Sequence, residues 1–315
     1  MSAAIQVQHL TRKFGAFVAV DDVSFEVQTG EIFGFLGSNG AGKSTTIRML
    51  CGLLRPSAGT AIVGGIDVAT DPEGVKRRIG YMSQRFSLYE LLTVDQNIRF
   101  FGGVYGLTPE RLEARRAFVI EMAGLRGREH SLARDLAGGW RQRLALGCAI
   151  LHEPAILFLD EPTGGVDPLS RRQFWRLIDT LATAGVSILV TTHYLDEAER
   201  CHRVTLIHAG RLAAIGTISE VKRVFAGRPI VEVRTPKATD AMRALDEMPG
   251  VEKTSLFGTA VHAVLKDSAQ EIGALEAQLG ARGIPVDSIE PVEPSLEDVF
   301  LDVVERAEAK RSVPA

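Results

Sequence analysis

The sequence predicts an α/β fold built on a parallel sheet, followed by a small α+β domain, and three observations support this prediction. Continuous apolar runs such as Ile32–Leu36 indicate strands buried on both faces. Helical patterns lie between these runs, and alternating strands and helices favour a parallel sheet with helices on both faces. A glycine-rich turn at 37–44 joins the first buried strand to a helix. The length of 315 residues fits roughly two domains.

The elements of the first domain follow from the spacing of apolar residues. Residues 1–27 are expected to form strands, because Val23, Phe25 and Val27 alternate with polar residues. The apolar patterns further predict strands at 32–36, 156–159, 187–191 and 203–207 and helices at 44–54, 144–152, 168–184 and 194–200. Three helix-like pieces follow one another between 93 and 127, which indicates a helical insertion at about 86–150.

The pattern changes after residue 225. Strands are predicted at 230–234, 251–257, 260–265 and 285–289, with helices at 239–248 and 268–282. Their order, βαββαβ, is the split-βαβ pattern of ferredoxin-like domains. Ser295 and Asp298 have the spacing of a capping box and are expected to start a last helix at 295–307. We therefore expect domains at 1–225 and 226–307, with a tail at 308–315.

Composition excludes several function classes. The net charge of −3 gives no electrostatic reason to expect nucleic acid as a partner. Cys51, Cys148 and Cys201 form no CxxC pair, so disulfides and thiolate metal sites are not expected and a reducing cytosol fits. The first residues lack the pattern of a secretory signal, and no run of about 18 apolar residues occurs. We expect any membrane crossing to be made by another chain.

A phosphate-binding loop is the strongest motif of the sequence. The candidate nucleotide-binding residues are Gly37, Ser38, Asn39, Gly40, Ala41, Gly42, Lys43, Ser44 and Thr45, of which 37–44 match GxxxxGK[ST] in full. Glycines let successive backbone N–H groups point at phosphate oxygens, and the helix that follows adds its positive end. Lys43 is expected to reach the β- and γ-phosphates, and Ser44 to offer its hydroxyl to Mg²⁺. The alternative is a glycine-rich turn that arose by chance.

Two adjacent acids complete this candidate site. Asp160 ends a buried strand, at the edge of an open α/β sheet where ligands bind. It is expected to hold Mg²⁺, usually through water. Glu161 carries a second carboxylate that can position or deprotonate an attacking water. On these residues alone, a solvated turn is the competing interpretation.

These motifs in this order resemble the nucleotide-binding subunit of an ATP-binding cassette (ABC) transporter, over residues 1 to about 225. The resemblance implies a P-loop NTPase with a RecA-like α/β core, an antiparallel β subdomain and a helical subdomain, with ATP and Mg²⁺ as cofactors. Gln84 resembles the Q-loop glutamine, which contacts the metal and the water. His193 resembles the switch histidine that holds the γ-phosphate. The resemblance thus implies catalytic roles for Lys43, Gln84, Glu161 and His193, and metal ligands at Ser44, Gln84 and Asp160.

Further positions are implied by the same resemblance. Phe14 lies at the place of the aromatic residue that stacks on adenine, and the alternative is that Phe14 or Phe17 belongs to the core. Asp167 lies in the place of the D-loop and would bridge to an opposite subunit.

The signature loop departs from the family pattern. Residues 136–140 read Leu-Ala-Gly-Gly-Trp where the family has Leu-Ser-Gly-Gly-Gln. The family's serine binds the γ-phosphate held by the other subunit, and Ala137 lacks that hydroxyl. Losing the cap-type hydrogen bond costs about 1 kcal/mol, and losing a phosphate contact costs about 1–3 kcal/mol. Because the N–H groups of Gly138 and Gly139 remain, we expect a weakened contact rather than none.

The implied mechanism needs partners. One phosphate loop and one signature loop per chain imply a homodimer, or a pair with a second ATPase subunit, that closes on ATP. A groove beside the Q-loop would receive a short helix of a membrane subunit. The candidate lining residues are Phe86, Leu88, Tyr89, Leu91 and Leu92, and the alternative is that they form the core of the helical subdomain.

The C-terminal segment narrows the subclass. Residues 294–300 and the small domain before them resemble ATP-binding subunits of bacterial type-2 exporters. We therefore expect an export motor on the cytoplasmic face of the bacterial inner membrane, bound to a polytopic permease and not to nucleic acid. The alternatives are a soluble ABC ATPase acting on ribosomes or DNA, an importer motor, or a regulatory subunit that hydrolyses ATP poorly.

Overall fold

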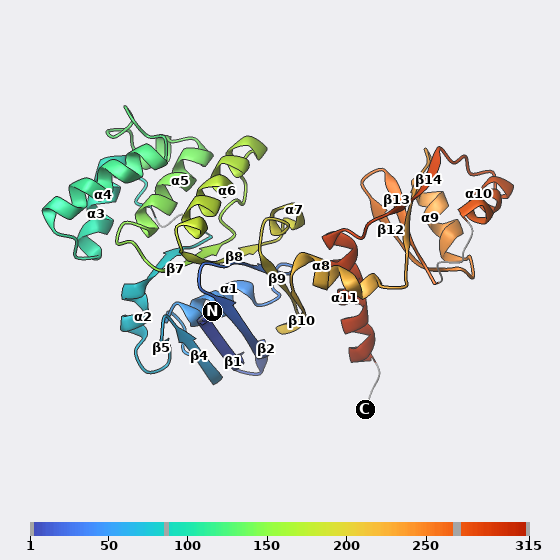
Figure 1. Ribbon diagram of the computed structural model, residues 1–315, viewed down its shortest axis with the longest axis horizontal. Coiled ribbons are helices and arrows are strands. Elements are labelled where there is room, and N and C mark those ends of the chain that lie inside the picture. Colours follow the sequence, from blue (N-terminus) through green and yellow to red (C-terminus); the bar gives the residue numbers. More distant parts are fainter. Residues whose placement is uncertain (1–2, 85–87, 267–271, 313–315) are drawn as a thin grey trace. The chain divides into compact units, whose positions relative to one another are not determined.

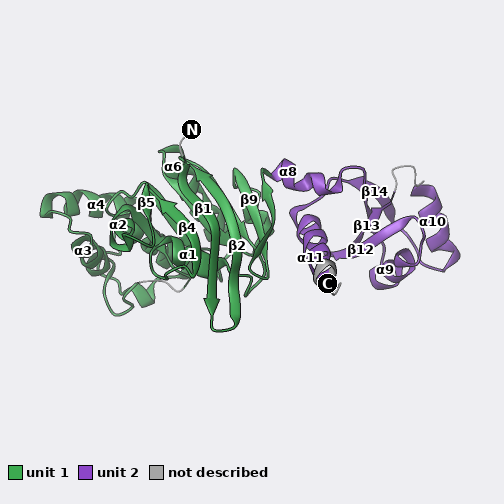
Figure 2. Ribbon diagram, turned by 90° about the horizontal axis from the view of Figure 1, so that it is seen from below, with its two compact units in different colours: residues 1–217 green, residues 218–315 purple. Residues whose placement is uncertain are grey.

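The computed structural model describes residues 3–84, 88–266 and 272–312. The chain divides into two compact units, Met1–Thr217 and Ile218–Ala315 (Figure 2). The helical segments α8 (Ile218–Lys222) and η2 (Arg223–Phe225) belong to the second unit, which therefore begins before the boundary expected at 225. No helix in the described residues is both long and apolar enough to span a membrane.

A six-stranded sheet organises the first unit (Figure 1). Its strands are β3 (Ile32–Leu36), β6 (Ile79–Met82), β7 (Ile156–Asp160), β8 (Ser187–Thr192), β9 (Arg203–His208) and β10 (Arg211–Gly216). The order is β10-β9-β3-β8-β7-β6, and every pairing is parallel except that of β9 with β10. All residues of β3, β7 and β8 are buried, which explains their continuous apolar sequences. The predicted parallel sheet is confirmed.

A second, antiparallel sheet contains β1 (Ala3–Phe14), β2 (Phe17–Gln28), β4 (Ala58–Val63) and β5 (Ile66–Asp67) in the order β2-β1-β4-β5. Helix α1 (Lys43–Leu50) contacts β2 and β4 of this sheet and β7 of the larger one. Its buried residues Ile47, Met49 and Leu50 join one core with apolar side chains of both sheets. This core fixes the start of α1, and with it the glycine-rich loop, against the large sheet.

Helices cover the side of the large sheet that faces away from α1 and the antiparallel sheet (Figure 1). Besides α2 (Pro72–Arg78), the first unit contains α3 (Val94–Val104), α4 (Pro109–Met122), the 3₁₀ turn η1 (Ala133–Asp135), α5 (Gly138–Ala149), α6 (Pro168–Thr183) and α7 (Leu195–Ala198).

Several helix bounds differ from the prediction. Only α3 and α4 form between 93 and 127, because Gly124 and Gly127 adopt positive φ angles in the segment after α4. Helix α1 ends at Leu50 rather than at 54, before Gly52 with its φ of 67°. Helix α5 begins at Gly138 rather than at 144, since its first turn has two glycines and a single apolar residue, too few to show a helical period.

The second unit has the predicted βαββαβ order. Its elements are β11 (Ile230–Arg234), α9 (Ala238–Asp246), β12 (Val251–Phe257), β13 (Ala260–Leu265), α10 (Ile272–Ala281), β14 (Ser288–Val292) and α11 (Leu296–Ser312). The sheet order is β12-β13-β11-β14 and all pairings are antiparallel, as in ferredoxin-like domains.

Details of this unit correct or refine the prediction. The strand expected at 285–289 spans 288–292, and the carbonyl of Pro285 instead accepts a hydrogen bond from the Thr235 hydroxyl. Residues 268–271 of the expected helix lie outside the described residues. The capping box is present: Asp298 N donates to Ser295 Oγ at 3.1 Å, and Ser295 N donates to Asp298 Oδ2 at 2.8 Å.

Candidate active site

The candidate site lies where four neighbouring parallel strands end. Strand β3 runs into Gly37, β7 ends with Asp160, β8 ends before His193, and β6 ends two residues before Gln84. The sheet order β3-β8-β7-β6 brings the carboxyl ends of these strands to one edge. In open α/β sheets this edge is where ligands bind.

The glycine-rich loop has a shape that requires glycine. Gly42 has φ 110°, and a Cβ atom there would lie 2.6 Å from the carbonyl oxygen of Ala19. A Cβ atom on Gly37 would clash with the carbonyl oxygen of Ile207. Gly42 is also the N-cap of α1, and no side chain caps this helix. The first N–H groups of α1 are therefore free of a capping side chain, which suits them to bind an anion.

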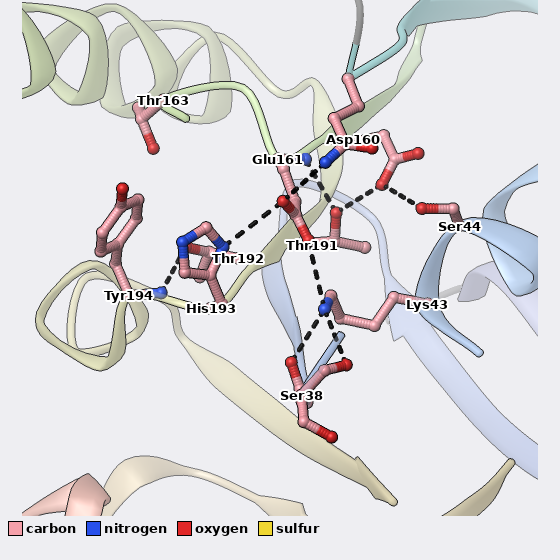
Figure 3. Close-up of polar contacts among 12 residues, drawn as sticks. Ser38, Lys43, Ser44, Asp160, Glu161, Thr163, Thr191, Thr192, His193 and Tyr194 are labelled. Carbon is pink, nitrogen blue, oxygen red and sulfur yellow. Dashed lines mark hydrogen bonds and ion pairs between the residues drawn. The ribbon is translucent and has the colours of Figure 1, made fainter. Parts of the chain in front are cut away.

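Lys43 joins this loop to the end of β7 (Figure 3). Its side chain is 4% exposed, and Nζ donates to the carbonyl oxygens of Gly37 at 2.8 Å and Ser38 at 3.2 Å. The same Nζ lies 3.2 Å from Glu161 Oε1. A buried ammonium is thus balanced by a carboxylate and two carbonyl groups, as a buried charge requires.

Asp160 and Ser44 form a pair of hard oxygen ligands. Asp160 is 2% exposed, and its Oδ1 accepts hydrogen bonds from Ser44 Oγ at 3.1 Å and Thr191 Oγ1 at 2.8 Å. Burial raises the pKa of Asp160 above its ordinary value, although the hydrogen bonds from Thr191 and Ser44 act in the opposite direction. A carboxylate oxygen beside a hydroxyl oxygen is a pair of hard ligands, which fits Mg²⁺.

Three of the predicted catalytic side chains converge on the carboxylate of Glu161 (Figure 3). Gln84 Nε2 donates to Glu161 Oε2 at 3.0 Å, and His193 Nδ1 lies 3.4 Å from the same oxygen. With Lys43, three of the expected catalytic residues contact this one carboxylate. The backbone of Glu161 has φ 47°, and its N–H donates to Thr191 Oγ1 at 2.8 Å. A positive φ at a non-glycine residue stores strain, which the surrounding contacts must offset.

Phe14 lies apart from this cluster. It ends β1 with 46% of its surface exposed, and the guanidinium carbon of Arg12 lies 4.6 Å from its ring centroid. Phe17 is 64% exposed. The alternative that either ring belongs to the core is therefore wrong, and Phe14 can stack on a base through the ring face that Arg12 does not cover.

The signature segment also lies apart from Glu161. Ala137 is the N-cap of α5 and makes no side-chain capping hydrogen bond, as its missing hydroxyl predicts. Gly139 packs so closely on Ser170 that a Cβ atom would clash with the hydroxyl. The guanidinium carbon of Arg128 lies 3.8 Å from the Trp140 ring centroid, so the tryptophan is held by a cation–π contact.

Asp167 caps the start of α6. Its Oδ1 accepts hydrogen bonds from Leu169 N at 3.1 Å and Ser170 N at 2.9 Å. These backbone hydrogen bonds, that from Ser170 above all, hold the pKa of Asp167 below its ordinary value. Among the described residues, no hydrogen bond or ion pair connects Asp167, Phe14 or the signature segment with Glu161.

Of the residues expected to line the groove beside the Q-loop, some are buried in the core and others are exposed. Leu88 is 8% exposed, whereas Tyr89 and Leu91 are 49% and 70% exposed. The Tyr89 ring makes an edge contact with Phe100, at 4.5 Å between centroids. Leu92 is half-buried, and Phe86 lies outside the described residues.

Sequence reasoning missed the polar network behind the site. Glu197, on α7, is 3% exposed and accepts hydrogen bonds from Thr163, Thr192 and Arg171. A single acid in a short helix gives no signal in the sequence. The pair Thr191-Thr192, directly before His193, was the one available hint, because adjacent hydroxyls ending a buried strand need polar partners.

Comparison with family models gives two matches. A model described as ABC transporter matches residues 20–164. A model described as the C-terminal domain of DrrA1-3-like ATP-binding proteins matches residues 216–304.

Individual proteins are similar over most of the chain. The Nod factor export ATP-binding protein I of Cupriavidus metallidurans is 35% identical over 307 residues, which cover 97% of this chain and 99% of that protein. The probable multidrug ABC transporter ATP-binding protein YbhF of Escherichia coli is 50% identical over 218 residues. That match covers 69% of this chain, but the chain spans only 38% of the length of YbhF. A solved structure titled as the ATP-binding subunit of an ABC transporter is 33% identical, with a TM-score of 0.65 over 71% of this chain and 93% of that one.

Proposed function

The chain belongs to the ATP-binding proteins of the ABC transporter family, and from this premise we propose that it is the ATP-hydrolysing motor subunit of an exporter. Relatives named for multidrug and Nod factor export support the direction of transport. The match of residues 216–304 to a DrrA-like C-terminal domain supports the type-2 export class. A separate membrane subunit forms the transport pathway in this proposal.

One observation carries the enzymatic part of the proposal: Lys43, Gln84 and His193 all contact the carboxylate of Glu161, beside the Asp160–Ser44 pair. Glu161 accepts a hydrogen bond from the attacking water and orients it toward the γ-phosphate. His193 and Lys43 stabilise the negative charge that develops on the phosphate oxygens. Mg²⁺, held by Ser44 and Asp160 with Gln84 nearby, supplies further positive charge to the phosphates when bound.

The contacts of Lys43 indicate how the site receives its substrate. Its ammonium group donates to two carbonyl oxygens of the glycine-rich loop. Phosphate oxygens of ATP take over these hydrogen bonds, because a charged acceptor binds an ammonium more strongly than a carbonyl does. The loop residues 37–45 then surround the phosphates, and the Phe14 ring stacks on the adenine.

Asp167 and the signature residues Ala137, Gly138 and Gly139 serve a second copy of the chain in this proposal. Among the described residues, no hydrogen bond or ion pair joins them to the Glu161 side chain of their own subunit, which leaves them available to the nucleotide of a partner. An isologous homodimer places each signature segment at the other subunit's phosphate loop, and ATP between them closes the pair.

The membrane subunit docks on the helical region. Tyr89, Leu91, Phe100 and Val104, on and before α3, are apolar side chains with exposed fractions between 41% and 70%, and Tyr89 contacts Phe100. Apolar surface of this kind marks interaction sites. Through this contact the chain is held as a peripheral protein at the cytoplasmic face of the bacterial inner membrane.

ATP turnover of the purified chain with Mg²⁺ tests the enzymatic part. Glu161→Gln is expected to lower kcat by about 10²- to 10⁴-fold while ATP still binds. Glu153→Gln is the matched control, because Glu153 also has a positive φ, of 58°, but its side chain is 50% exposed and pairs with Arg111. Turnover by the Glu161→Gln variant at the wild-type rate would show that Glu161 has another role.

Capture of partners tests the transport part. The tagged Glu161→Gln chain is expressed in its own host, trapped with ATP and Mg²⁺, and recovered from solubilised membranes. A polytopic membrane protein is expected among the captured proteins. Ribosomal proteins or nucleic-acid enzymes, with no membrane protein, would favour a soluble ABC ATPase instead.

A further inference from the structure

A buried carboxylate close to the candidate site is held by three residues, one from the loop after β7, one at the end of β8 and one in α6. Glu197 of α7 is 3% exposed. Its Oε2 accepts hydrogen bonds from Thr163 Oγ1 at 2.7 Å and Thr192 Oγ1 at 3.0 Å, and its Oε1 accepts one from Arg171 Nε at 2.9 Å. Its negative charge is balanced by Arg171, so the carboxylate is both paired and hydrogen-bonded.

Two of these partners bracket the loop that carries Asp167. Thr163 lies directly before the turn at 164–167, and Arg171 lies in the first part of α6, directly after it. Asp167 itself caps α6. Both ends of this loop are therefore bound to one carboxylate. A displacement of the loop must either break hydrogen bonds to a buried charge or move that charge.

The third partner of Glu197, Thr192, belongs to the segment that carries His193. Thr192 precedes His193, and its hydroxyl donates to Glu197. The same hydroxyl accepts a hydrogen bond from Tyr194 N at 2.9 Å (Figure 3). The guanidinium carbon of Arg171 lies 4.0 Å from the Tyr194 ring centroid, and that ring lies 4.1 Å from the His193 ring. Residues on both sides of His193 are thus fixed by Glu197 or by its partner Arg171.

We propose that Glu197 is a positioning residue that couples the loop carrying Asp167 to the orientation of His193. When a partner subunit contacts that loop, the shift reaches His193 through the hydrogen bonds of Glu197. Nucleotide hydrolysis then depends on the partner's position, although Glu197 touches no substrate. This inference rests on the proposed ATPase and its dimer.

The first test compares two variants of α7. Glu197→Gln removes the charge and leaves an amide, whose single oxygen accepts while its NH₂ group only donates. Asp196→Asn is the matched control, because Asp196 lies 3.3 Å from Arg171 Nη2 but its side chain is 75% exposed. We expect Glu197→Gln to lower kcat by about 10- to 100-fold, with the Kd for ATP unchanged, and Asp196→Asn to stay within about twofold of wild type. Equal kcat values for the two variants would overturn the proposal.

A double-mutant cycle separates positioning from a general effect on the fold. If Glu197 acts through His193, Glu197→Gln has no further effect on kcat once His193 is alanine. Losses that multiply in the double variant would show that Glu197 acts elsewhere. Thr192→Val and Thr163→Val keep the charge pair and remove one hydroxyl each, so they test the same link should Glu197→Gln fold poorly. Thr192→Val is expected to reproduce the loss in kcat, and wild-type kcat in both threonine variants would refute the coupling.

A readout that does not need turnover distinguishes this inference from the proposed function. The imidazole NMR signals of His193, assigned with His193→Ala, are expected to shift in Glu197→Gln and to stay unchanged in Asp196→Asn. If the wild-type chain fails to hydrolyse ATP, the proposed function is wrong, and the NMR comparison still decides whether Glu197 positions His193. Unchanged signals in both variants would overturn the positioning role.

Discussion

Ala137 stands where the family's signature loop has serine, and replacing it by serine is expected to restore the missing hydrogen bonds. Ala137 has φ −58° and ψ 151°, the extended conformation of an N-cap residue, yet α5 has no side-chain cap. A serine hydroxyl at this position is placed to accept a hydrogen bond from the N–H of Gly139 or Trp140. An N-cap serine stabilises by about 0.5–2 kcal/mol over alanine. For a unit of this size, each kcal/mol raises Tm by roughly 2–4 °C.

The same hydroxyl has a second expected effect, on the closed dimer. In the proposed assembly it donates to a phosphate oxygen held by the partner subunit. A hydrogen bond to a charged group contributes about 1.5–3 kcal/mol. A two-fold dimer contains two such contacts, which together contribute about 3–6 kcal/mol. Since 1.4 kcal/mol is a factor of ten, ATP-driven dimerisation of the Ala137→Ser variant is expected to strengthen by about 10²- to 10⁴-fold.

Two measurements and one control separate these effects. Thermal unfolding reports the cap, and sedimentation with ATP in the Glu161→Gln background reports dimerisation. Ala137→Gly is the control, because glycine is also favoured over alanine as an N-cap but brings no hydroxyl. It is expected to raise Tm and leave dimerisation unchanged. A Tm for Ala137→Ser no higher than that of wild type would refute the capping argument. Equal dimerisation of the serine and glycine variants would refute the contact across the dimer.

Three further predictions concern other parts of the chain. Gly42→Ala is expected to abolish ATP binding in equilibrium dialysis and to destabilise the fold by about 1–3 kcal/mol, because a Cβ atom at φ 110° would lie 2.6 Å from the carbonyl oxygen of Ala19. Asn97→Ala is expected to cost about 2–4 kcal/mol in urea unfolding, since this side chain is fully buried and makes four hydrogen bonds to backbone groups of Tyr89, Leu92 and Thr93. Burial lowers the pKa of His262, but the hydrogen bond and charge of Asp298 outweigh it, so the pKa of His262 is raised. The stability that the charged His262 contributes is therefore fully present below a pH of about 6.5, and it is lost as the pH rises through the raised pKa of His262. His262→Ala is expected to flatten this part of the pH dependence of the unfolding free energy, measured by urea unfolding of the full chain. An unchanged pH dependence would contradict the assignment.

Much of the site was predictable because parallel strands share one edge. Lys43 and Asp160 are far apart in the sequence, but each lies at the carboxyl end of, or just after, a strand whose apolar run is unmistakable. Once strands and helices alternate, these ends must meet. The same argument brings Glu161 and His193 to this edge, where their side chains lie 3.4 Å apart.

Other features carried no signal in the sequence. The start of α5 at Gly138 was missed because its first two residues are glycines, which have weak helix propensity, whereas in the structure Gly139 packs closely on Ser170. Glu197 was missed because its importance arises only when Thr163 and Thr192 meet in space. Leu88 and Tyr89 are neighbours in one apolar segment, and only tertiary packing decides that one is buried and the other exposed.

The place of β3 in the large sheet has a consequence for how the chain is made. Both neighbours of β3 come late: Ile32 pairs with Ile188 of β8, and Phe33 with Arg203 of β9. At a synthesis rate of about 5–20 residues per second, the ribosome needs roughly 10–30 s to proceed from β3 to β8. During that interval the strand has no partner of its own sheet, and its five apolar or small residues stay available to other nascent chains. The phosphate loop thus emerges early but acquires its shape late, and a chain that stops before β8 exposes an aggregation-prone strand.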